Sequence, residues 1–79
     1  MQKLITTIKK SGFEELRIEL SEYHTNGKMY QMASARVYYE DGAVFKPGRN
    51  GINVKVELLP ALVKALVKAE EEARAGGLL

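Results

Sequence analysis

The chain has 79 residues, with 12 lysines and arginines, 10 aspartates and glutamates, a net charge of +2 and no cysteine. This length excludes a second domain, and the lack of cysteine excludes disulfides and cysteine-based zinc sites. A core built from so short a chain is marginally stable, so we expect a second copy to complete it. No apolar run is long enough for a signal peptide or a membrane span, so we expect a soluble intracellular protein without a membrane partner.

Charge is unevenly distributed along the chain. Residues 1–56 carry nine basic and six acidic side chains, a net +3, whereas residues 57–79 carry three basic and four acidic ones, a net −1. We therefore interpret the two parts as separate surfaces.

The first part of the chain has the pattern of an antiparallel hairpin. Residues 16–21 alternate between apolar and polar side chains, which is typical of a half-buried strand. Asn26-Gly27 readily takes the positive φ angles of a tight turn, and residues 28–39 beyond it are rich in aromatic and β-branched side chains. Residues 1–15 are an N-terminal extension or an edge strand, because residues 4–8 either lengthen the first strand or form a separate one.

A second turn and a bend follow. Asp41-Gly42 has the same turn chemistry, and residues 43–46 run extended until Pro47-Gly48 bends or bulges this third strand. Residues 52–56 alternate again, which predicts a fourth strand. We therefore expect a four-stranded meander over residues 16–56.

From residue 57 the hydrophobic pattern takes a helical period. Pro60 suits the first turn of a helix and Gly76-Gly77 ends it, so we predict a helix over residues 57–75 and a tail over residues 76–79. Apolar or small side chains cover more than half of the helix circumference, which is more than one sheet can bury.

This wide apolar face predicts that two copies associate through their helices. The predicted dimer interface consists of Leu58, Leu59, Leu62, Ala65, Leu66 and Ala69. The alternative is that the alanines are only good helix formers at an exposed surface.

Catalysis has little support in the side chains present. His24 is the single histidine and lies in a turn, without a cysteine to activate or a second imidazole to share a metal. Turn formation explains the neighbouring carboxylates Glu40 and Asp41. We therefore predict no enzymatic activity, no catalytic residue, no metal site and no cofactor.

The most informative segment is residues 45–52. Two glycines and a proline bend the backbone there, Lys46 and Arg49 bring positive charge, and the backbone N–H groups at glycines such as Gly48 are accessible. Such a bend can bind phosphate groups, whereas the pattern taken alone is also that of an ordinary basic turn.

Basic and aromatic side chains are interleaved on the strands around this bend. They are Arg17, Tyr23, Lys28, Tyr30, Arg36, Tyr38, Tyr39 and Lys55. Basic groups that neutralise phosphates, together with rings that stack on bases, are how proteins hold single strands without reading their sequence. Tyr38 and Tyr39 are consecutive, so only one of them can face such a ligand.

The order of these parts resembles that of a known family. The chain contains an aromatic hairpin, a strand ending in Arg36-Val37-Tyr38-Tyr39, an acidic turn, the segment Lys46-Pro47-Gly48-Arg49-Asn50-Gly51-Ile52 and a helix. This order is similar to that of the single-stranded-DNA-binding domain of the transcriptional coactivator positive cofactor 4 and its prokaryotic and phage relatives. The resemblance covers residues 16–66. It implies an α+β fold, in which a curved four-stranded antiparallel sheet precedes a helix (β-β-β-β-α, Whirly-like), and a homodimer joined through the helices.

The same resemblance implies a nucleic-acid-binding site. Lys46 and Arg49 are similar to phosphate contacts of the family, and Tyr23 and Tyr39 stand where it has rings that stack on bases. With the other basic positions and the bend, the predicted site is Arg17, Tyr23, Lys28, Arg36, Tyr39, Lys46, Gly48, Arg49 and Lys55. Asn50 stands where the coactivator has a basic residue, so we expect other basic side chains, such as Lys55, to supply contacts.

We therefore expect a homodimer that binds single-stranded DNA with low sequence specificity in transcription, replication or repair, with the transcription or replication machinery as a further partner. The expected location is the cytoplasm, at the nucleoid or in a phage-infected host, or the nucleus of a eukaryote. One alternative is a single-strand binder that prefers RNA, and another is a scaffold dimer whose basic face binds an acidic protein. A nuclease would need an acidic metal cluster that the sequence lacks.

Overall fold

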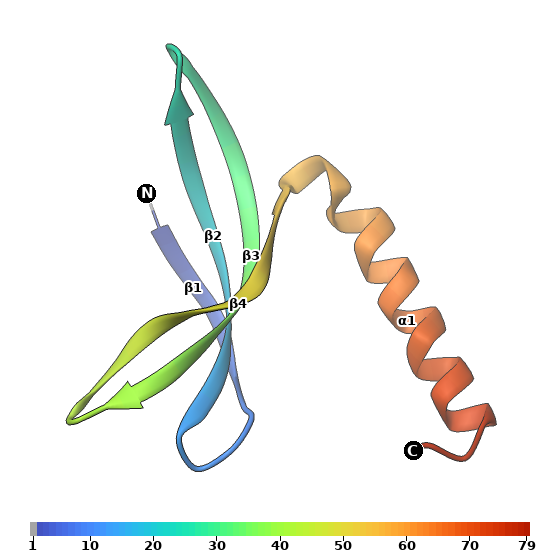
Figure 1. Ribbon diagram of the computed structural model, residues 1–79. Helices are drawn as coiled ribbons and strands as arrows, with labels where there is room; N and C mark the ends of the chain where they lie inside the picture. Colours follow the sequence, from blue (N-terminus) through green and yellow to red (C-terminus); the bar gives the residue numbers. More distant parts are fainter. Residues whose placement is uncertain (1) are drawn as a thin grey trace.

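The computed structural model describes residues 2–79, and residue 1 of the predicted N-terminal segment lies outside the described residues. Four antiparallel strands form one open sheet in the order β1-β2-β3-β4, and a helix follows (Figure 1). The elements are β1 (Gln2–Lys9), β2 (Glu14–Thr25), β3 (Lys28–Asp41), β4 (Val44–Lys55), the short 3-10 turn η1 (Val56–Leu58) and α1 (Leu59–Ala75). The predicted α+β fold, a four-stranded antiparallel sheet with a C-terminal helix, is confirmed.

The strands divide the chain differently from the sequence pattern. Residues 44–46 and 52–55, from the segments expected as third and fourth strands, belong to one continuous strand, β4, whereas Val56 begins η1. The missing strand is supplied by the N-terminal segment, because β1 is a separate edge strand that pairs with β2 from Gln2↔Ser21 to Lys9↔Glu15. β4 continues through Pro47-Gly48 because a bulge, rather than a chain reversal, accommodates the bend.

The local sequence explains where the strands turn and where the helix ends. Asn26 and Gly27 take positive φ angles of 50° and 74° between β2 and β3, and Gly42 takes 70° between β3 and β4. At the end of α1, the Gly76 N–H donates to the Glu72 carbonyl at 2.9 Å, and Gly77 has a φ of 77°. The predicted turns and helix end are therefore confirmed.

The alternation of side chains gives the sheet two faces with different chemistry. The polar face carries Arg17, Glu19, Ser21, Tyr23, Lys28, Tyr30, Ser34, Arg36, Tyr38 and Lys55. The apolar face carries Leu16, Ile18, Leu20, Ala33, Ala35, Val37, Ile52 and Val54. Side-chain polarity thus separates a surface for polar ligands from a surface that must be covered.

The helix leaves the apolar face largely uncovered. Figure 1 shows α1 projecting away from the strands. An apolar cavity of about 200 Å³ separates the two elements, with Ile18, Ile52 and Val54 on the sheet side and Leu59 and Leu62 on the helix side. Among residues 2–79, Ala33 is the only apolar residue that is buried, at 5 % exposure. One copy of the chain therefore has almost no core of its own.

Neither α1 nor η1 has the length and unbroken hydropathy that a bilayer-spanning helix requires, and these are the helices among residues 2–79.

Candidate nucleic-acid interface

The bulge in β4 depends on two glycines that approach β3 closely. Arg36 pairs with Gly51 and Tyr38 with Pro47, so three residues of β4 lie opposite one residue of β3. A Cβ atom on Gly48 would lie 2.9 Å from the Val37 carbonyl oxygen. A Cβ atom on Gly51 would lie 2.7 Å from another backbone carbonyl oxygen of β3. Glycine is therefore required at both positions for β4 to bulge without leaving the sheet.

Arg36 and Arg49 belong to this bulge in different ways. The Arg36 Nη1 donates to the Gly48 carbonyl oxygen at 3.3 Å, so the guanidinium fastens the bulge to β3. Arg49 lies within the bulge and is exposed. It forms no ion pair within residues 2–79. Of the two arginines, Arg49 has its charge fully available to a ligand.

The tip of the β3–β4 hairpin carries two further predicted residues. Lys46 pairs with Tyr39 across the strands, and the Tyr39 side chain is 42 % exposed. The Lys46 ammonium nitrogen lies 2.7 Å from Asp41 Oδ2, and both side chains are about half exposed. An exposed ion pair contributes little free energy, so a phosphate group can displace the Asp41 carboxylate.

Arg17 is held inside the polar face. Its guanidinium carbon lies 4.2 Å from the centre of the Tyr38 ring and 5.9 Å from that of Phe45. Its Nε donates to Glu15 Oε1 at 2.7 Å. The charge of Arg17 is therefore already compensated within the sheet. Phe45 was not among the predicted site residues, although its alternation with Lys46 is visible in the sequence.

A buried carboxylate lies at the centre of the polar face. Glu19 is 8 % exposed and accepts hydrogen bonds from Gln2 Nε2 at 2.8 Å and from the Tyr38 hydroxyl at 3.1 Å. Burial, and then the hydrogen bond to Glu19, raises the pKa of Tyr38 above its usual value. The Tyr38 hydroxyl therefore takes part in a hydrogen-bonded cluster with Glu19 and Gln2 that joins β1, β2 and β3. Tyr39 is the accessible ring of this consecutive pair.

The other end of the polar face carries Tyr23, Lys28 and Lys55. Tyr23 is 58 % exposed and pairs with Tyr30. Lys28 follows the turn and is exposed. Lys55 lies at the end of β4. Neither lysine forms an ion pair within residues 2–79.

The structure therefore brings the predicted residues together in two groups. The first group lies on the polar face and consists of Arg17, Tyr23, Lys28, Arg36 and Lys55. Tyr39 and Lys46 form the second group, which the register places on the opposite side of the β3–β4 ribbon. Gly48 and Arg49 lie in the bulge between the two groups.

The residues predicted at a dimer interface differ in how they are exposed. Leu58 and Leu66 are 53 % and 60 % exposed, and Ala65 and Ala69 are also exposed. Leu59, Leu62 and Leu66 line the cavity beneath the helix, so Leu66 is at once exposed and part of the cavity wall.

Metal binding finds no support in this geometry. Nowhere in residues 2–79 do three or more histidine, cysteine, aspartate or glutamate side chains gather in a way that could hold a metal ion.

Among known proteins, the matches to this chain are solved structures. No protein-family model matches the chain, and no curated protein sequence does. A PC4 homolog from Burkholderia pseudomallei is 27 % identical, with a TM-score of 0.73 over 89 % of this chain and 98 % of the other. MoSub1 in complex with single-stranded DNA is 30 % identical, with a TM-score of 0.59 over 90 % of this chain and 78 % of the other. A second MoSub1–DNA complex is 26 % identical, with a TM-score of 0.57 over 91 % of this chain and 85 % of the other.

Since 89–91 % of this chain is covered, these similarities extend over the sheet and the helix together. At 30 % identity over most of both chains, the likeness reaches beyond a shared fold. The chain belongs to the positive cofactor 4 (PC4) family.

Proposed function

We propose that this protein is a homodimer that binds single-stranded DNA with low sequence specificity and acts in transcription, replication or repair. The observation that carries the proposal is the relationship to MoSub1, whose structure was solved with single-stranded DNA. The chemistry of the candidate interface supports it independently, because exposed tyrosine rings and cations that form no ion pair within residues 2–79 occur on three neighbouring strands of one sheet, β2, β3 and β4.

The proposed mechanism separates affinity into two contributions. Arg49, Lys28 and Lys55 neutralise backbone phosphates and release counterions, with Lys46 joining them when it leaves Asp41. Tyr23 and Tyr39 stack on unpaired bases, which is sequence-tolerant because every base has a π-face. A duplex is disfavoured because its bases are already stacked on one another and its backbone is stiff.

The homodimer is proposed from the uncovered surfaces of one copy. The cavity between sheet and helix is lined almost entirely by apolar side chains, and the predicted interface leucines Leu58 and Leu66 are more than half exposed. Fully burying such a side chain contributes about 1.5–3 kcal/mol. A second copy that supplies its own helix would bury both surfaces at once and complete the core.

The test is a binding titration with single-stranded DNA, duplex DNA and RNA of one sequence, each at two salt concentrations. We expect single-stranded DNA to bind more tightly than duplex, with affinity falling as salt rises. Equal affinity for duplex and single strand, or affinity that ignores salt, would contradict the proposal. Tighter binding of RNA would indicate an RNA-preferring protein, and no binding to any of the three would favour the scaffold dimer.

Binding measurements on three variants test which residues form the site. Arg49→Gln should weaken binding to all sequences and reduce the salt slope by about 0.7, the value for one phosphate of a single strand. Tyr39→Ala should weaken binding by about 1–3 kcal/mol without that change of slope. Lys68→Gln removes an exposed charge on α1, outside the candidate interface, and is the matched control. If Arg49→Gln and Tyr39→Ala behave like Lys68→Gln, the interface lies elsewhere.

A further inference from the structure

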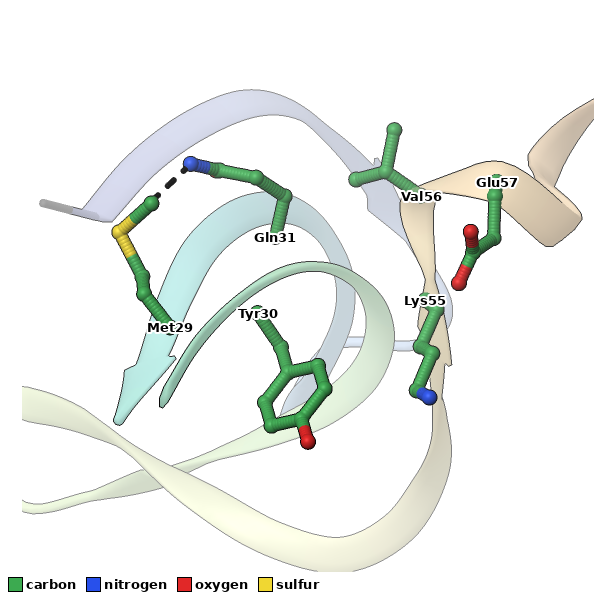
Figure 2. A pocket seen from close by; sticks show the side chains of 6 residues that line it. All are labelled: Met29, Tyr30, Gln31, Lys55, Val56 and Glu57. Atoms are coloured by element: carbon green, nitrogen blue, oxygen red, sulfur yellow. Dashed lines mark hydrogen bonds between the residues drawn. The ribbon is translucent and has the colours of Figure 1, made fainter. Parts of the chain in front are cut away.

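A pocket opens at the corner where β4 ends beside β3 (Figure 2). β4 ends at Lys55, which pairs with Met32, so the first residues of β3 have no strand beside them on that edge. The space has a volume of about 390 Å³ and is lined by Met29, Tyr30, Gln31, Lys55, Val56 and Glu57. It lies at the opposite end of β4 from the hairpin tip that carries Lys46 (Figure 1).

Tyr30 and Lys55 give this corner pocket its chemistry. The Lys55 ammonium nitrogen lies 4.8 Å from the centre of the Tyr30 ring, and Figure 2 shows both side chains directed to the same side of the sheet. Lys55 forms no ion pair within the described part of the chain, residues 2–79. The pocket therefore offers an uncompensated cation held over an aromatic ring.

The corner pocket continues the polar face rather than forming an isolated hollow. Tyr30 pairs directly with Tyr23, whose ring is 58 % exposed. A second hollow of about 360 Å³ lies next to it and is lined in part by Tyr23, Met32 and Asn53. A chain that follows the polar face from Arg36 toward the end of β4 thus reaches Tyr30 last.

We propose that the corner pocket is a second nucleotide subsite, in which Tyr30 stacks on a base while Lys55 contacts the adjoining phosphate. This inference rests on the proposed function and adds to it a ring that the family resemblance does not assign. Glu57 lines the same pocket, and its negative charge confines the phosphate to the Lys55 side.

Binding at this subsite exchanges one ring contact for another. A cation over a ring at an exposed site is worth a factor of about 2 to 5 in an equilibrium constant. Stacking of a base on a ring is worth a factor of about 5 to 150, and the displaced ammonium gains a phosphate. The exchange is therefore favourable, and in the absence of DNA the ammonium covers the ring.

The position of the pocket sets the length of DNA that can use it together with the bulge. Tyr30 and Arg36 are six residues apart in β3, which corresponds to about 20 Å at ~3.3 Å per residue. A strand with stacked spacing of ~3.4 Å per nucleotide covers that distance with about six nucleotides. A short oligonucleotide cannot fill both places, whereas a longer one can.

The test is the affinity for oligothymidylates of about 4 to about 12 nucleotides, a range typical of single-strand binders. For the unmodified protein, affinity should keep rising along the series. For Tyr30→Leu it should level off early, with a loss of about fivefold or more at the longest length. Tyr30→Phe keeps the ring and is the matched control, so its curve should follow that of the unmodified protein.

Lys55→Gln provides a second variant at an exposed position, where folding is not at risk. It should lower the salt slope by about 0.7 for the longest oligonucleotide and leave the slope for the shortest unchanged. Parallel length curves for Tyr30→Leu and the unmodified protein, or equal losses in Tyr30→Leu and Tyr30→Phe, would overturn the subsite while leaving the proposed function intact. Failure of the unmodified protein to bind any member of the series would overturn both.

Discussion

Replacement of Gly51 by alanine probes the bulge that organises the candidate interface. The added Cβ atom would lie 2.7 Å from the Ala35 carbonyl oxygen and 2.8 Å from the Arg36 Cα atom, whereas ordinary contact begins at 3.4 Å. Both neighbours are backbone atoms in the centre of β3, so β4 must move outward by several tenths of an ångström. Overpacking of this kind costs about 1–3 kcal/mol. At about 4–8 °C per kcal/mol for a domain of this size, Tm should fall by roughly 4–24 °C.

The assay is urea unfolding of Gly51→Ala and of the matched control Gly12→Ala. A Cβ atom on Gly12 meets nothing within 4 Å, and Gly12 does not have a positive φ angle. Gly12→Ala should therefore stay within about 0.5 kcal/mol of the unmodified protein. All three proteins are compared at one concentration, because association with a second copy would shift the transition. If Gly51→Ala unfolds at the same urea concentration as Gly12→Ala, the close approach of β4 to β3 does not constrain this position.

Three further substitutions test the other contacts. Asp41→Asn removes the carboxylate that competes for Lys46, so it should tighten binding of single-stranded DNA with little change in the salt slope, because Lys46 contacts the same phosphate in both proteins; a slope steeper by about 0.7 would mean that Lys46 stays paired with Asp41 in the unmodified protein and would contradict displacement. Tyr38→Phe removes the hydrogen bond to Glu19 and should cost about 1 kcal/mol in urea unfolding. The raised pKa of Tyr38 means that the unfolded chain loses its proton first, so this stabilisation is present below about pH 10 and lost above it, and Tyr38→Phe should lack that part of the decline. If the proposed homodimer forms through α1, Leu66→Glu should convert it to monomer in sedimentation equilibrium, and a persistent dimer would place the interface elsewhere.

The fold could be predicted where its causes are local. Asn26-Gly27 and Asp41-Gly42 take turn conformations that depend on their own backbone preferences, and the end of α1 depends on Gly76 and Gly77. Alternation likewise assigned the sides of β2, because a period of two belongs to the strand itself. These features do not depend on which residue lies opposite in the neighbouring strand.

The continuity of β4 could not be predicted because its cause is not local. Neighbours along the chain indicate a bend or bulge at Pro47-Gly48, but they do not show that the same strand continues to Lys55. The strand continues because Val37 of β3 lies opposite three residues, and that register appears only when two strands are paired. The sequence does not separate the edge strand β1 from a longer first strand for the same reason, since Ser11-Gly12 after residues 4–8 is compatible with either.

The sequence also did not predict which basic side chains of the site form ion pairs. In the sequence, Lys46 and Arg17 look the same as the other basic side chains, yet Asp41 and Glu15 neutralise them in the structure. The buried Glu19 appeared in the sequence only as one polar position of an alternating strand. Which cations remain available to a ligand depends on pairing across turns and on side-chain direction, so counting charges overestimates the number of available phosphate contacts.

The two groups of candidate residues can serve one ligand only if the sheet turns between them. Tyr39 and Lys46 lie on the opposite local side of the ribbon from Arg36, but a local side is not a fixed direction in a twisted sheet. A bulge increases the local twist, and this one lies between the groups, where Figure 1 shows the β3–β4 hairpin turning away from the β2–β3 hairpin. Gly51→Ala should therefore weaken binding of long oligonucleotides, which must contact both groups, more than binding of short ones. Equal losses at every length would mean that the bulge contributes to stability alone and does not set the angle between the groups.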